Sequence, residues 1–328
     1  MSEGLGEFDL IKRYFNDNQD LMSDSDVVIG IGDDCAILDV PNGFQLAVTT
    51  DSLVAGVHFF EDVCPYRLGY KSLAVNLSDL AAMGALPKWV SLAITLPSVD
   101  EKWLSEFSRG FFDLAKKHKV VLIGGDTTKG PLSITVSAKG IVQRNKALRR
   151  SNAKPGELIC VSGNIGDGGI GLACKLNQIS LINNSPFIDA LEKTEPRNEL
   201  GFLLKSYAST CIDISDGLIQ DLYHVLDTSN CSASLELDKL PLSDAMQTEI
   251  EHQTLSHEQA MQFALTGGDD YELLFTIEKQ KYKQLCLQKN VTPVTVIGEV
   301  TENTSVKVNL THLGKSVSAQ LAGWDHFK

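Results

Sequence analysis

The chain has 328 residues, and its 42 acidic and 29 basic side chains give a formal net charge of −13. This charge disfavours nucleic-acid binding through a generally basic surface. No apolar run reaches the roughly 18 to 20 residues of a membrane span, and the first residues lack the apolar core of a signal peptide, so we expect a cytoplasmic protein without a membrane partner. The cysteines are scattered without a CxxC pair, which argues against a disulfide framework or a thiolate zinc site.

Predicted strands and helices alternate through the first half of the chain. Apolar and β-branched runs predict strands near residues 27–31, 44–50, 88–96, 120–124 and 132–142. One helix begins at Pro65, a residue favoured in the first helical turn, and ends at Met83, just before Gly84. A second helix covers residues 101–118, where large apolar side chains recur at helical spacing and predict a core-facing stripe.

The helix that begins at Pro65 is apolar around most of its circumference. A helix of this kind is normally buried. A narrow polar line runs through it, formed by Ser72, Asn76 and Asp79 at helical spacing. A buried carboxylate needs partners, so Asp79 is a candidate metal ligand. The alternative is a carboxylate that faces solvent on a half-exposed helix.

A basic stretch that contains Pro and Gly, residues 144–163, separates the two halves of the chain. Length alone suggests about two domains. We therefore expect a first domain over residues 1–147 and a second over residues 148–328.

The second half opens with a glycine-rich turn, residues 161–173, whose backbone amides are suited to an anion. It lacks the Gly-Lys-Ser/Thr of a P-loop, and a turn that only serves packing is the alternative. An amphipathic helix follows Asp216, and Ser215 or Asp216 is its candidate N-cap. Further elements are expected at 271–278 and 292–300 (strands) and around 279–289 (helix).

Aspartates close five apolar runs in this chain, each beside Gly, Thr or Ser. The runs are VVIGIGDD with Asp33 and Asp34, QLAVTTD with Asp51, VVLIGGD with Asp126, CIDISDG with Asp213 and Asp216, and FALTGGDD with Asp269 and Asp270. A short apolar run bounded by turn residues is typical of a buried strand, so we expect a carboxylate where each strand leaves its sheet. A single aspartate of this kind usually bonds to its own backbone. Five together favour a shared site.

If these carboxylates converge, they need cations between them. Two carboxylates about 4 Å apart repel by about 4 kcal/mol at an effective dielectric of 20. Carboxylates and the hydroxyls of Thr49 and Thr50 are hard oxygen ligands, which suit Mg²⁺ better than zinc. Magnesium held by aspartates most often serves phosphates, and phosphoryl transfer depends on positioning and charge neutralisation. The sequence has no GxSxG or HExxH motif that would indicate other chemistry.

A series of segments, in one order along the chain, resembles the thiamine-monophosphate kinases, which belong to the superfamily typified by aminoimidazole ribonucleotide synthetase. The segments are GEFDLIKRYF, GIGDDCA, TTDSLVAGVHF, YKSLAVNLSDLAAMGA, LIGGDTTKGPLSITV, RRSNAKPGE, IDISDGL, GGDDYEL and GWDHF. The resemblance implies Mg²⁺-dependent transfer of the γ-phosphoryl group of ATP to the phosphate of thiamine monophosphate, which gives thiamine diphosphate and ADP. A phosphate monoester has a second pKa near 6 and is mostly a dianion at pH 7, so no general base is expected.

The resemblance also assigns residues to the site. It implies that several Mg²⁺ ions are held by Asp34, Thr49, Thr50, Asp51, Asp79, Asp126, Asp213 and Asp216. It implies that ATP contacts Gly125, Asp126, Arg150 and Ser215, and that the thiamine moiety contacts His58, Asp269 and Trp324. The family usually has Glu at the position of Asp269, whose side chain is one methylene shorter. A solvated linker charge is the alternative for Arg150, and a core residue is the alternative for Trp324.

The fold that the resemblance implies is a pair of α+β domains, with the first domains of two copies forming a shared β-barrel in a homodimer and the active site in a cleft. Competing functions are another ATP-dependent member of the superfamily, a Mg²⁺-dependent phosphatase and a non-catalytic metal-binding protein. A selenophosphate synthetase would need a reactive cysteine in an N-terminal glycine-rich loop, whereas Cys35 is expected to be a small buried residue. The hydrogenase-maturation protein would need a tail with a cysteine, and this chain has GWDHF there.

Overall fold

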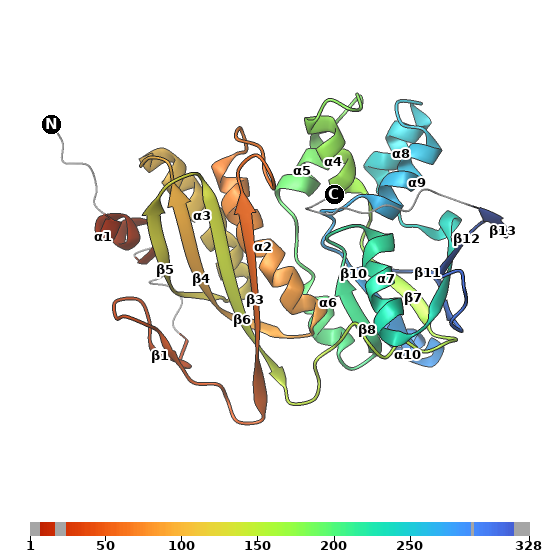
Figure 1. Cartoon of the computed structure of the whole chain (residues 1–328), viewed down its shortest axis with the longest axis horizontal. Helices are drawn as coiled ribbons and strands as arrows, with labels where there is room; N and C mark the ends of the chain where they lie inside the picture. Colours follow the sequence, from red (N-terminus) through yellow and green to blue (C-terminus); the bar gives the residue numbers. More distant parts are fainter. Residues whose placement is uncertain (1–6, 17–23, 290–291, 318–328) are drawn as a thin grey trace. The chain divides into compact units, whose positions relative to one another are not determined.

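Two compact units make up the structure, a computed structural model that describes residues 7–16, 24–289 and 292–317 (Figure 1). The first unit holds the chain up to Leu80 together with Ala85–Lys146. The second unit holds Ala81–Gly84 and the chain from Ala147 onward. Within the described ranges, every helix is too short or too polar to cross a lipid bilayer.

A four-stranded sheet forms the centre of the first unit. Its order is β3-β6-β4-β5, with bounds Phe44–Val54, Ser133–Gln143, Leu86–Leu96 and Val121–Lys129. β4 pairs with β5 in parallel, and the other two pairings are antiparallel. A separate ribbon of β1 (Val27–Ile29) and β2 (Ile37–Leu38) packs against Trp89 of β4. β3 and β5 are therefore the two edges of the main sheet.

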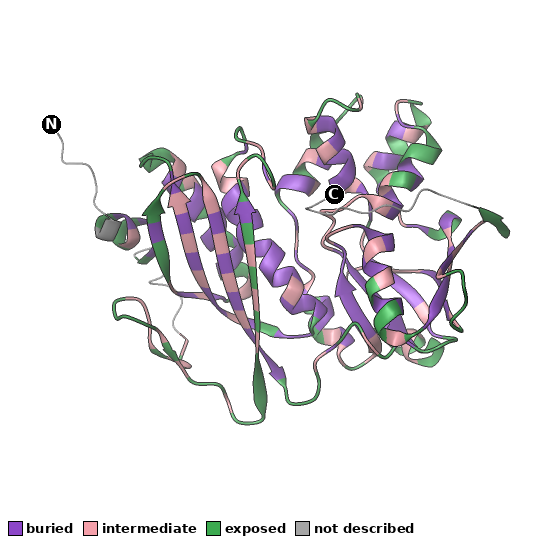
Figure 2. Cartoon of the chain, viewed as in Figure 1, coloured by how far each residue is buried: buried purple, intermediate pink, exposed green. Residues whose placement is uncertain are grey.

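Helices α2 (Pro65–Ala82) and α3 (Glu101–His118) lie on one side of this sheet (Figure 1). α2 is buried along most of its length, as its apolar circumference predicted (Figure 2). α3 begins where the carboxylate of Asp100 accepts hydrogen bonds from two amides of the first turn, and Phe107 and Phe111 of its apolar stripe are fully buried. Both helices are confirmed to within one residue. At the start of the described chain, α1 (Glu7–Leu10) leads into the short helix η1 (Ile11–Asn16).

Glycines at the crossing of α2 and α3 let the two helices approach closely. A Cβ at Gly69 would lie 2.0 Å from the carbonyl oxygen of Phe107. A Cβ at Gly110 would lie 1.9 Å from the carbonyl oxygen of Tyr66. In both places the obstacle is main chain, which cannot move aside like the end of a side chain, so any larger residue would separate the helices.

Two strands of the first unit run farther than the sequence predicted. β3 continues past residue 50 to Val54, and β5 continues past residue 124 to Lys129, so Asp51 and Asp126 lie inside strands. The expectation that these carboxylates stand at strand ends is wrong. The glycine pair before Asp126 has the composition of a turn, but pairing with β4 overrides it. A Cβ at Gly125 would lie 1.8 Å from the carbonyl oxygen of Leu92, so this glycine permits the close approach of the two strands.

A seven-stranded sheet forms the centre of the second unit, in the order β13-β12-β9-β11-β7-β10-β8. The strands are β7 (Leu158–Ser162), β8 (Ala208–Asp213), β9 (Ser232–Glu236), β10 (Leu273–Ile277), β11 (Val294–Thr301), β12 (Val308–His312) and β13 (Lys315–Val317). β12 pairs with β9 in parallel, and the other described pairings in this sheet are antiparallel.

Helices cover both faces of this second sheet. They are α4 (Asp167–Lys175), α5 (Ser185–Glu192), α6 (Asn198–Leu204), α7 (Leu218–Ser229), the short η3 (Leu237–Lys239), α8 (Asp244–Glu251), α9 (His257–Thr266) and α10 (Lys279–Leu285). Ile212 and Leu274 of the central strands share a core with α7 and α9. Their neighbours Cys211 and Phe275 share another core with α6 and α10. Burial on both faces explains why consecutive residues of these strands are apolar, such as Cys211 and Ile212 of β8 and Leu274 and Phe275 of β10.

One predicted strand is a helix. Residues 263–266, the apolar part of FALTGGDD, end α9, and the strand in this region begins only at Leu273. α9 starts with a capping box, in which the hydroxyl of Ser256 accepts from the amide of Gln259 and the side chain of Gln259 accepts from the amide of Ser256. A short apolar run does not distinguish a strand from a buried helix.

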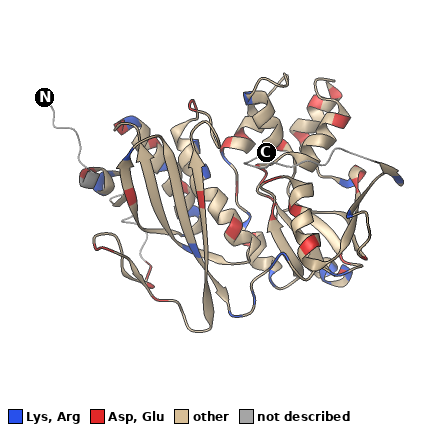
Figure 3. Cartoon of the chain, viewed as in Figure 1, with Lys and Arg blue, Asp and Glu red and all other residues tan. Residues whose placement is uncertain are grey.

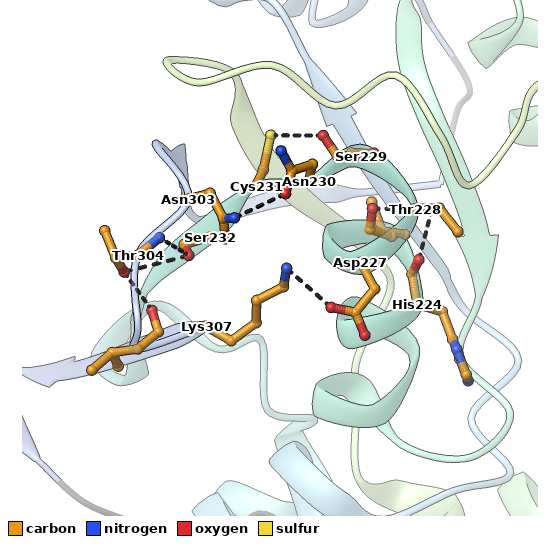
Figure 4. Close-up of polar contacts among 12 residues, drawn as sticks. His224, Asp227, Thr228, Ser229, Asn230, Cys231, Ser232, Asn303, Thr304 and Lys307 are labelled. Atoms are coloured by element: carbon orange, nitrogen blue, oxygen red, sulfur yellow. Dashed lines mark hydrogen bonds and ion pairs between the residues drawn. The ribbon is translucent and has the colours of Figure 1, made fainter.

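The end of α7 is tied to the connection between β11 and β12 (Figure 4). Lys307 Nζ lies 3.0 Å from Oδ1 of Asp227. The side-chain amide of Asn303 donates to Oδ1 of Asn230 at 2.8 Å, and Asn230 ends the helix in the left-handed conformation with φ 53°. These contacts fix the C-terminal end of α7, whose N-terminal end follows the turn with Ser215 and Asp216.

We expect Gly110→Ala to destabilise the first unit, because its methyl group would meet the main chain of Tyr66. Overpacking of this kind typically costs about 1 to 3 kcal/mol. The midpoint of thermal unfolding measures the effect. Gly124→Ala is the matched control in the same unit, since a Cβ there would have no heavy atom within 4 Å. Equal midpoints for the two variants would contradict the close helix crossing.

Asp167, the first residue of α4, is a partly buried carboxylate of the second unit. Burial raises its pKa to about 6, and the nearby charge of Glu272 acts in the same direction. The hydroxyl of Ser243 donates to Asp167 Oδ1 at 2.8 Å and partly offsets this rise. A carboxyl group whose pKa is higher in the folded state stabilises the fold at low pH, and this contribution is lost as the pH rises through about 6.

Asp167→Asn should therefore change how stability depends on pH. The variant does not titrate at this position. From pH 4 to pH 8, the difference in free energy of unfolding between variant and wild type should therefore shift in favour of the variant by about 2 to 3 kcal/mol. Denaturant unfolding of both proteins across this range measures the difference. Parallel curves would show that the carboxylate is not held in a desolvated place.

Candidate active site

The first group of candidate residues joins β3 and α2. Thr49 and Asp51 are two residues apart on β3, so their side chains share one face of the strand. The hydroxyl of Thr49 donates a hydrogen bond to Oδ2 of Asp79 on α2. Burial, with a further contribution from the charge of Asp79, raises the pKa of Asp51 to about 6. The structure thus brings together two carboxylates and one hydroxyl from parts of the chain about 30 residues apart.

This group has the donor chemistry of a magnesium site. Its oxygens are hard ligands, and two mutually repelling carboxylates gain from a cation between them. Among the described residues, however, no set of three or more His, Cys, Asp or Glu side chains is arranged to hold a metal ion. Asp51 and Asp79 with Thr49 are therefore a partial ligand set that needs further oxygen ligands.

Thr50 points to the opposite face of β3. Its hydroxyl donates to the carbonyl oxygen of Thr49 at 2.8 Å, and the side chain is exposed. The next residue on that face, Ser52, shares a hydrogen bond of 2.7 Å with Thr135 of β6. Thr50 is therefore on the open side of the sheet, away from α2.

Asp126 lies far from Asp51 within the same sheet. Figure 3 shows acidic positions on β5 and β3, the two edges, and these strands carry one acidic residue each, Asp126 and Asp51. Backbone pairing leads from Asp126 across β4 and β6 to Ser52, the residue after Asp51. With about 4.8 Å between neighbouring strands, Asp126 and Ser52 are about 14 Å apart. Paired residues share a face, so Asp126 also faces the side opposite to Asp51.

The other candidates of the first unit lie in loops. Asp34 is exposed between β1 and β2, and the neighbouring Cys35 is exposed too, so the expectation that this cysteine is buried is wrong. The loop is too short to cover its own side chains. His58 lies just after β3, and its Nδ1 accepts a hydrogen bond from the amide of Val54 at 3.1 Å. With Nδ1 as the acceptor, the proton of the neutral ring is on Nε2.

The second group of candidate residues surrounds the turn between β8 and α7. Asp213 ends β8 and is 4% exposed, and Ser215 and Asp216 follow in the turn. The prediction that Ser215 or Asp216 is the N-cap of α7 is wrong. Gly217 is the N-cap, and it has no side chain to accept a capping hydrogen bond. Instead, Oδ2 of Asp221 accepts hydrogen bonds from the amides of Ser215 and Asp216, both at 3.1 Å.

Arg150 and Asp269 lie against the same turn. The charge of Arg150 lowers the pKa of Asp221, although burial of this carboxyl and the charge of Asp216 together raise that pKa to about 7. The amide of Asp269 donates to the carbonyl oxygen of Ser215 at 2.9 Å. Asp269 adopts a left-handed backbone with φ 64°. The structure therefore gathers the predicted residues of the second unit around one turn, while Trp324 lies outside the described residues.

The glycine-rich turn already binds a carboxyl group that belongs to the protein. The amides of Gly166 and Gly168 donate to Oδ2 and Oδ1 of Asp270, at 2.7 and 3.2 Å. Burial raises the pKa of Asp270 well above its ordinary value. These contacts support the interpretation that this turn serves packing.

The sequence analysis did not single out Asp221, and it named Asp270 only as one of the two aspartates that close FALTGGDD, without assigning it a ligand. Asp221 sits a few positions after the candidate Asp216 and looks like one more surface charge beside it. The available signal was a carboxylate in the first turn of a helix, where amides of the preceding turn need an acceptor. That signal is common in helices, so it did not set Asp221 apart.

A cleft of about 560 Å³ lies between η1 and the outer face of α3. It is lined mostly by charged side chains, among them Arg13, Glu101, Lys102, Arg109 and Lys116. None of the predicted site residues lines it. Its charged lining is accounted for in part by the ion pair of Arg13 with Glu101, at 2.8 Å.

Family models match both halves of the chain. Residues 32–142 match the N-terminal domain of AIR synthase related proteins, and residues 154–311 match the C-terminal domain of the same proteins. The thiamine-monophosphate kinase of Haemophilus influenzae is 47% identical, over 99% of this chain and 98% of that protein. The thiamine-monophosphate kinase of Bacillus subtilis is 34% identical, over 99% of this chain and 100% of that protein.

Solved structures agree with these matches. The thiamine-monophosphate kinase of Stenotrophomonas maltophilia superposes with a TM-score of 0.82 at 40% identity, covering 95% of this chain and 98% of that one. The protein AaThiL, solved with AMPPCP and TMP, superposes with a TM-score of 0.76 at 30% identity, covering 98% and 97%. These comparisons confirm the two-domain α+β fold that the sequence motifs implied. The chain belongs to the thiamine-monophosphate kinase family of AIR synthase related proteins.

Proposed function

We propose that this protein transfers the γ-phosphoryl group of ATP to the phosphate of thiamine monophosphate and releases thiamine diphosphate and ADP. The observation that carries this proposal is similarity over whole chains to thiamine-monophosphate kinases, together with a relative solved with AMPPCP and TMP. The paired carboxylates Asp51 and Asp79 fit this chemistry, because the reaction brings together two anions that repel each other.

The reaction needs no general base from the protein. The acceptor phosphate has a second pKa near 6, so at pH 7 most molecules already carry the nucleophilic dianion. The obstacle is repulsion between this dianion and the triphosphate. Magnesium ions, when bound, would neutralise charge on the phosphates and align acceptor and donor.

Each group of residues takes a part in this proposal. Asp51, Asp79 and Thr49 hold cations on the first unit, and we assign Asp34, Thr50, Asp126, Asp213 and Asp216 to the same set of ions. Because the amide of Ser215 already donates to Asp221, the contact of Ser215 with the nucleotide is through its hydroxyl. The guanidinium of Arg150 is suited to a bidentate grip on phosphate oxygens. Gly125 lines the nucleotide, and His58, Asp269 and Trp324 contact the thiamine moiety.

We further propose that the protein acts as a homodimer in which the first units form a shared barrel. The edge strand β3 exposes a row of apolar side chains on the open face of the sheet, including Leu46 (45% exposed) and Val48 (59% exposed). An open strand edge with an apolar face invites pairing with another strand. A second copy that brings its β5 edge beside β3 would cover this face, and two such contacts follow from one two-fold axis.

This dimer would also complete the cation site. Asp126 lies about 14 Å from β3 in its own sheet, too far to share an ion with Asp51. In the dimer, the partner's Asp126 would lie on the open face beside Thr50, while Thr49 and Asp51 of the same edge strand face α2. The cation ligands along β3 would thereby gain a further carboxylate.

The proposed reaction is tested with purified protein, Mg²⁺, ATP and thiamine monophosphate. We expect ADP and thiamine diphosphate in equal amounts, with unphosphorylated thiamine inert. Asp51→Asn should lower turnover on the order of 100-fold or more because it removes a cation ligand. Asp39→Asn, an exposed carboxylate of the same unit, should match the wild type. ADP without thiamine diphosphate would favour another ATP-dependent member of the superfamily, and loss of phosphate from thiamine monophosphate would favour a phosphatase.

The shared site is tested by mixing two inactive variants. Asp51→Asn and Asp126→Asn are co-expressed with different tags, and the mixed dimer is isolated through both tags. If the partner's Asp126 completes the site, one of the two sites in the mixed dimer contains no substitution, and turnover should be about half that of the wild type. If Asp126 serves its own chain, each site of the mixed dimer carries one substitution, and it should be as inactive as its parents.

A further inference from the structure

Two carboxylates outside the proposed ligand sets bind main-chain amides beside the candidate residues: Asp221 binds the turn that carries Ser215 and Asp216, and Asp270 ties the turn that carries Asp269 to the glycine-rich turn. Asp221 lies in the first turn of α7 and is 2% exposed. Asp270 follows Asp269 directly in the chain. Neither residue is assigned to the cations, the nucleotide or the thiamine moiety. The hydrogen bonds that they accept come from main-chain amides.

Asp221 uses a single oxygen to hold two consecutive residues. Its Oδ2 lies 3.1 Å from the amide nitrogen of Ser215 and 3.1 Å from that of Asp216. The N-cap residue Gly217 has no side chain that could satisfy these amides. The direction of the Ser215 hydroxyl and of the Asp216 carboxylate therefore depends on Asp221.

Asp270 uses both of its oxygens. Oδ2 accepts from Gly166 at 2.7 Å, and Oδ1 accepts from Gly168 at 3.2 Å. The residues on either side, Asp269 and Tyr271, have left-handed backbones with φ 64° and 51°. Such a conformation is costly for residues other than glycine and persists only where the surroundings enforce it. The hydrogen bonds to Asp270 help to hold this conformation. So do two backbone hydrogen bonds, from the amide of residue 269 to the carbonyl oxygen of residue 215 and from the amide of residue 271 to that of residue 214.

We propose that Asp221 and Asp270 are positioning residues, which act in place of bound anions to fix the two turns of the site. Asp221 orients Ser215 and Asp216, which are proposed to contact the nucleotide and its cations. Asp270 orients Asp269, which is proposed to contact the thiamine moiety. This inference rests on the proposed function.

The two residues should differ in how they tolerate asparagine. The side-chain carbonyl oxygen of asparagine can replace the one oxygen of Asp221 that accepts both amides. At position 270 asparagine presents one acceptor and one amino group, so the amino group would face the amide of Gly166 or Gly168 and lose a hydrogen bond. A role in overall stability alone would not change KM for one substrate while leaving KM for the other substrate unchanged.

The experiment measures KM for ATP and for thiamine monophosphate, with kcat, in four full-length proteins: the wild type, Asp221→Asn, Asp221→Ala and Asp270→Asn. Asp221→Ala should raise KM for ATP by about 10- to 100-fold, as residues that orient ligands typically do. Its KM for thiamine monophosphate should stay within about threefold of the wild type, because the turn with Asp269 that is proposed to contact this substrate is unchanged. Asp221→Asn should restore KM for ATP to within about threefold. Asp270→Asn should raise KM for thiamine monophosphate and leave KM for ATP unchanged.

Titration with a non-hydrolysable ATP analogue and Mg²⁺ supplies a readout that does not depend on turnover. Asp221→Ala should bind the analogue more weakly by the same factor, and Asp221→Asn should bind it like the wild type. Equal analogue affinity for the wild type and Asp221→Ala overturns the inference, and so does an equal rise of both KM values in Asp270→Asn. If Asp221→Ala does not fold, equal KM values for thiamine monophosphate in the two asparagine variants overturn it. A wild type that forms no thiamine diphosphate would instead refute the proposed function.

Discussion

A carboxylate taken out of water must gain hydrogen-bond donors or a positive charge, and this requirement organises both units of the protein. In the second unit, Asp221 and Asp270 gain donors from the main chain and thereby fix the turns beside β8 and β10. In the first unit, Asp51 and Asp79 lie close enough for the charge of one to raise the pKa of the other. Asp221 and Asp270 therefore have their hydrogen-bond donors within the protein. Asp51 and Asp79 become favourable when a cation binds between them, as phosphate chemistry requires.

Sequence patterns predicted the helices of the first unit well, because α2 and α3 are long and have clear termini. The strand ends were harder to predict. β5 continues through a glycine pair because it pairs with β4, a contact between residues far apart in the chain. In the second unit, residues 263–266 had the composition of a strand but end α9, and the better evidence was the capping box that Ser256 and Gln259 form earlier in the chain. Local composition therefore failed where tertiary pairing or a distant cap decided the structure.

For the candidate site, the motifs named candidate residues but said little about the distances between them. Thr49, Asp51 and Asp79 come together, as do Ser215, Asp216 and Asp269. Asp126 does not join Asp51, because a run of residues carries no information on whether its strand is at the near or far edge of a sheet. Strand order depends on the whole fold. In this protein Asp51 and Asp126 lie on the opposite edge strands β3 and β5, and this is why we propose a site shared between two copies of the chain.

The fold alone would not have indicated this chemistry. A hydrogenase maturation protein, HypE, solved with ATP, superposes with a TM-score of 0.76 at 18% identity, which shows a common fold and no more. What distinguishes the present chain is the set of side chains that it places on that fold. Specificity for an acceptor therefore has to be sought in turns such as the one at residues 269–271, and not in the sheets.

The left-handed backbone at Asp269 has a consequence for the identity of that residue. Aspartate tolerates positive φ better than glutamate does, because its short side chain can bond to nearby main chain. The family resemblance implies glutamate at this position, with a longer reach. The shorter side chain of Asp269 suits the left-handed backbone, and in the proposed site it would hold its carboxylate farther from the thiamine moiety, with room for a water molecule to relay the contact.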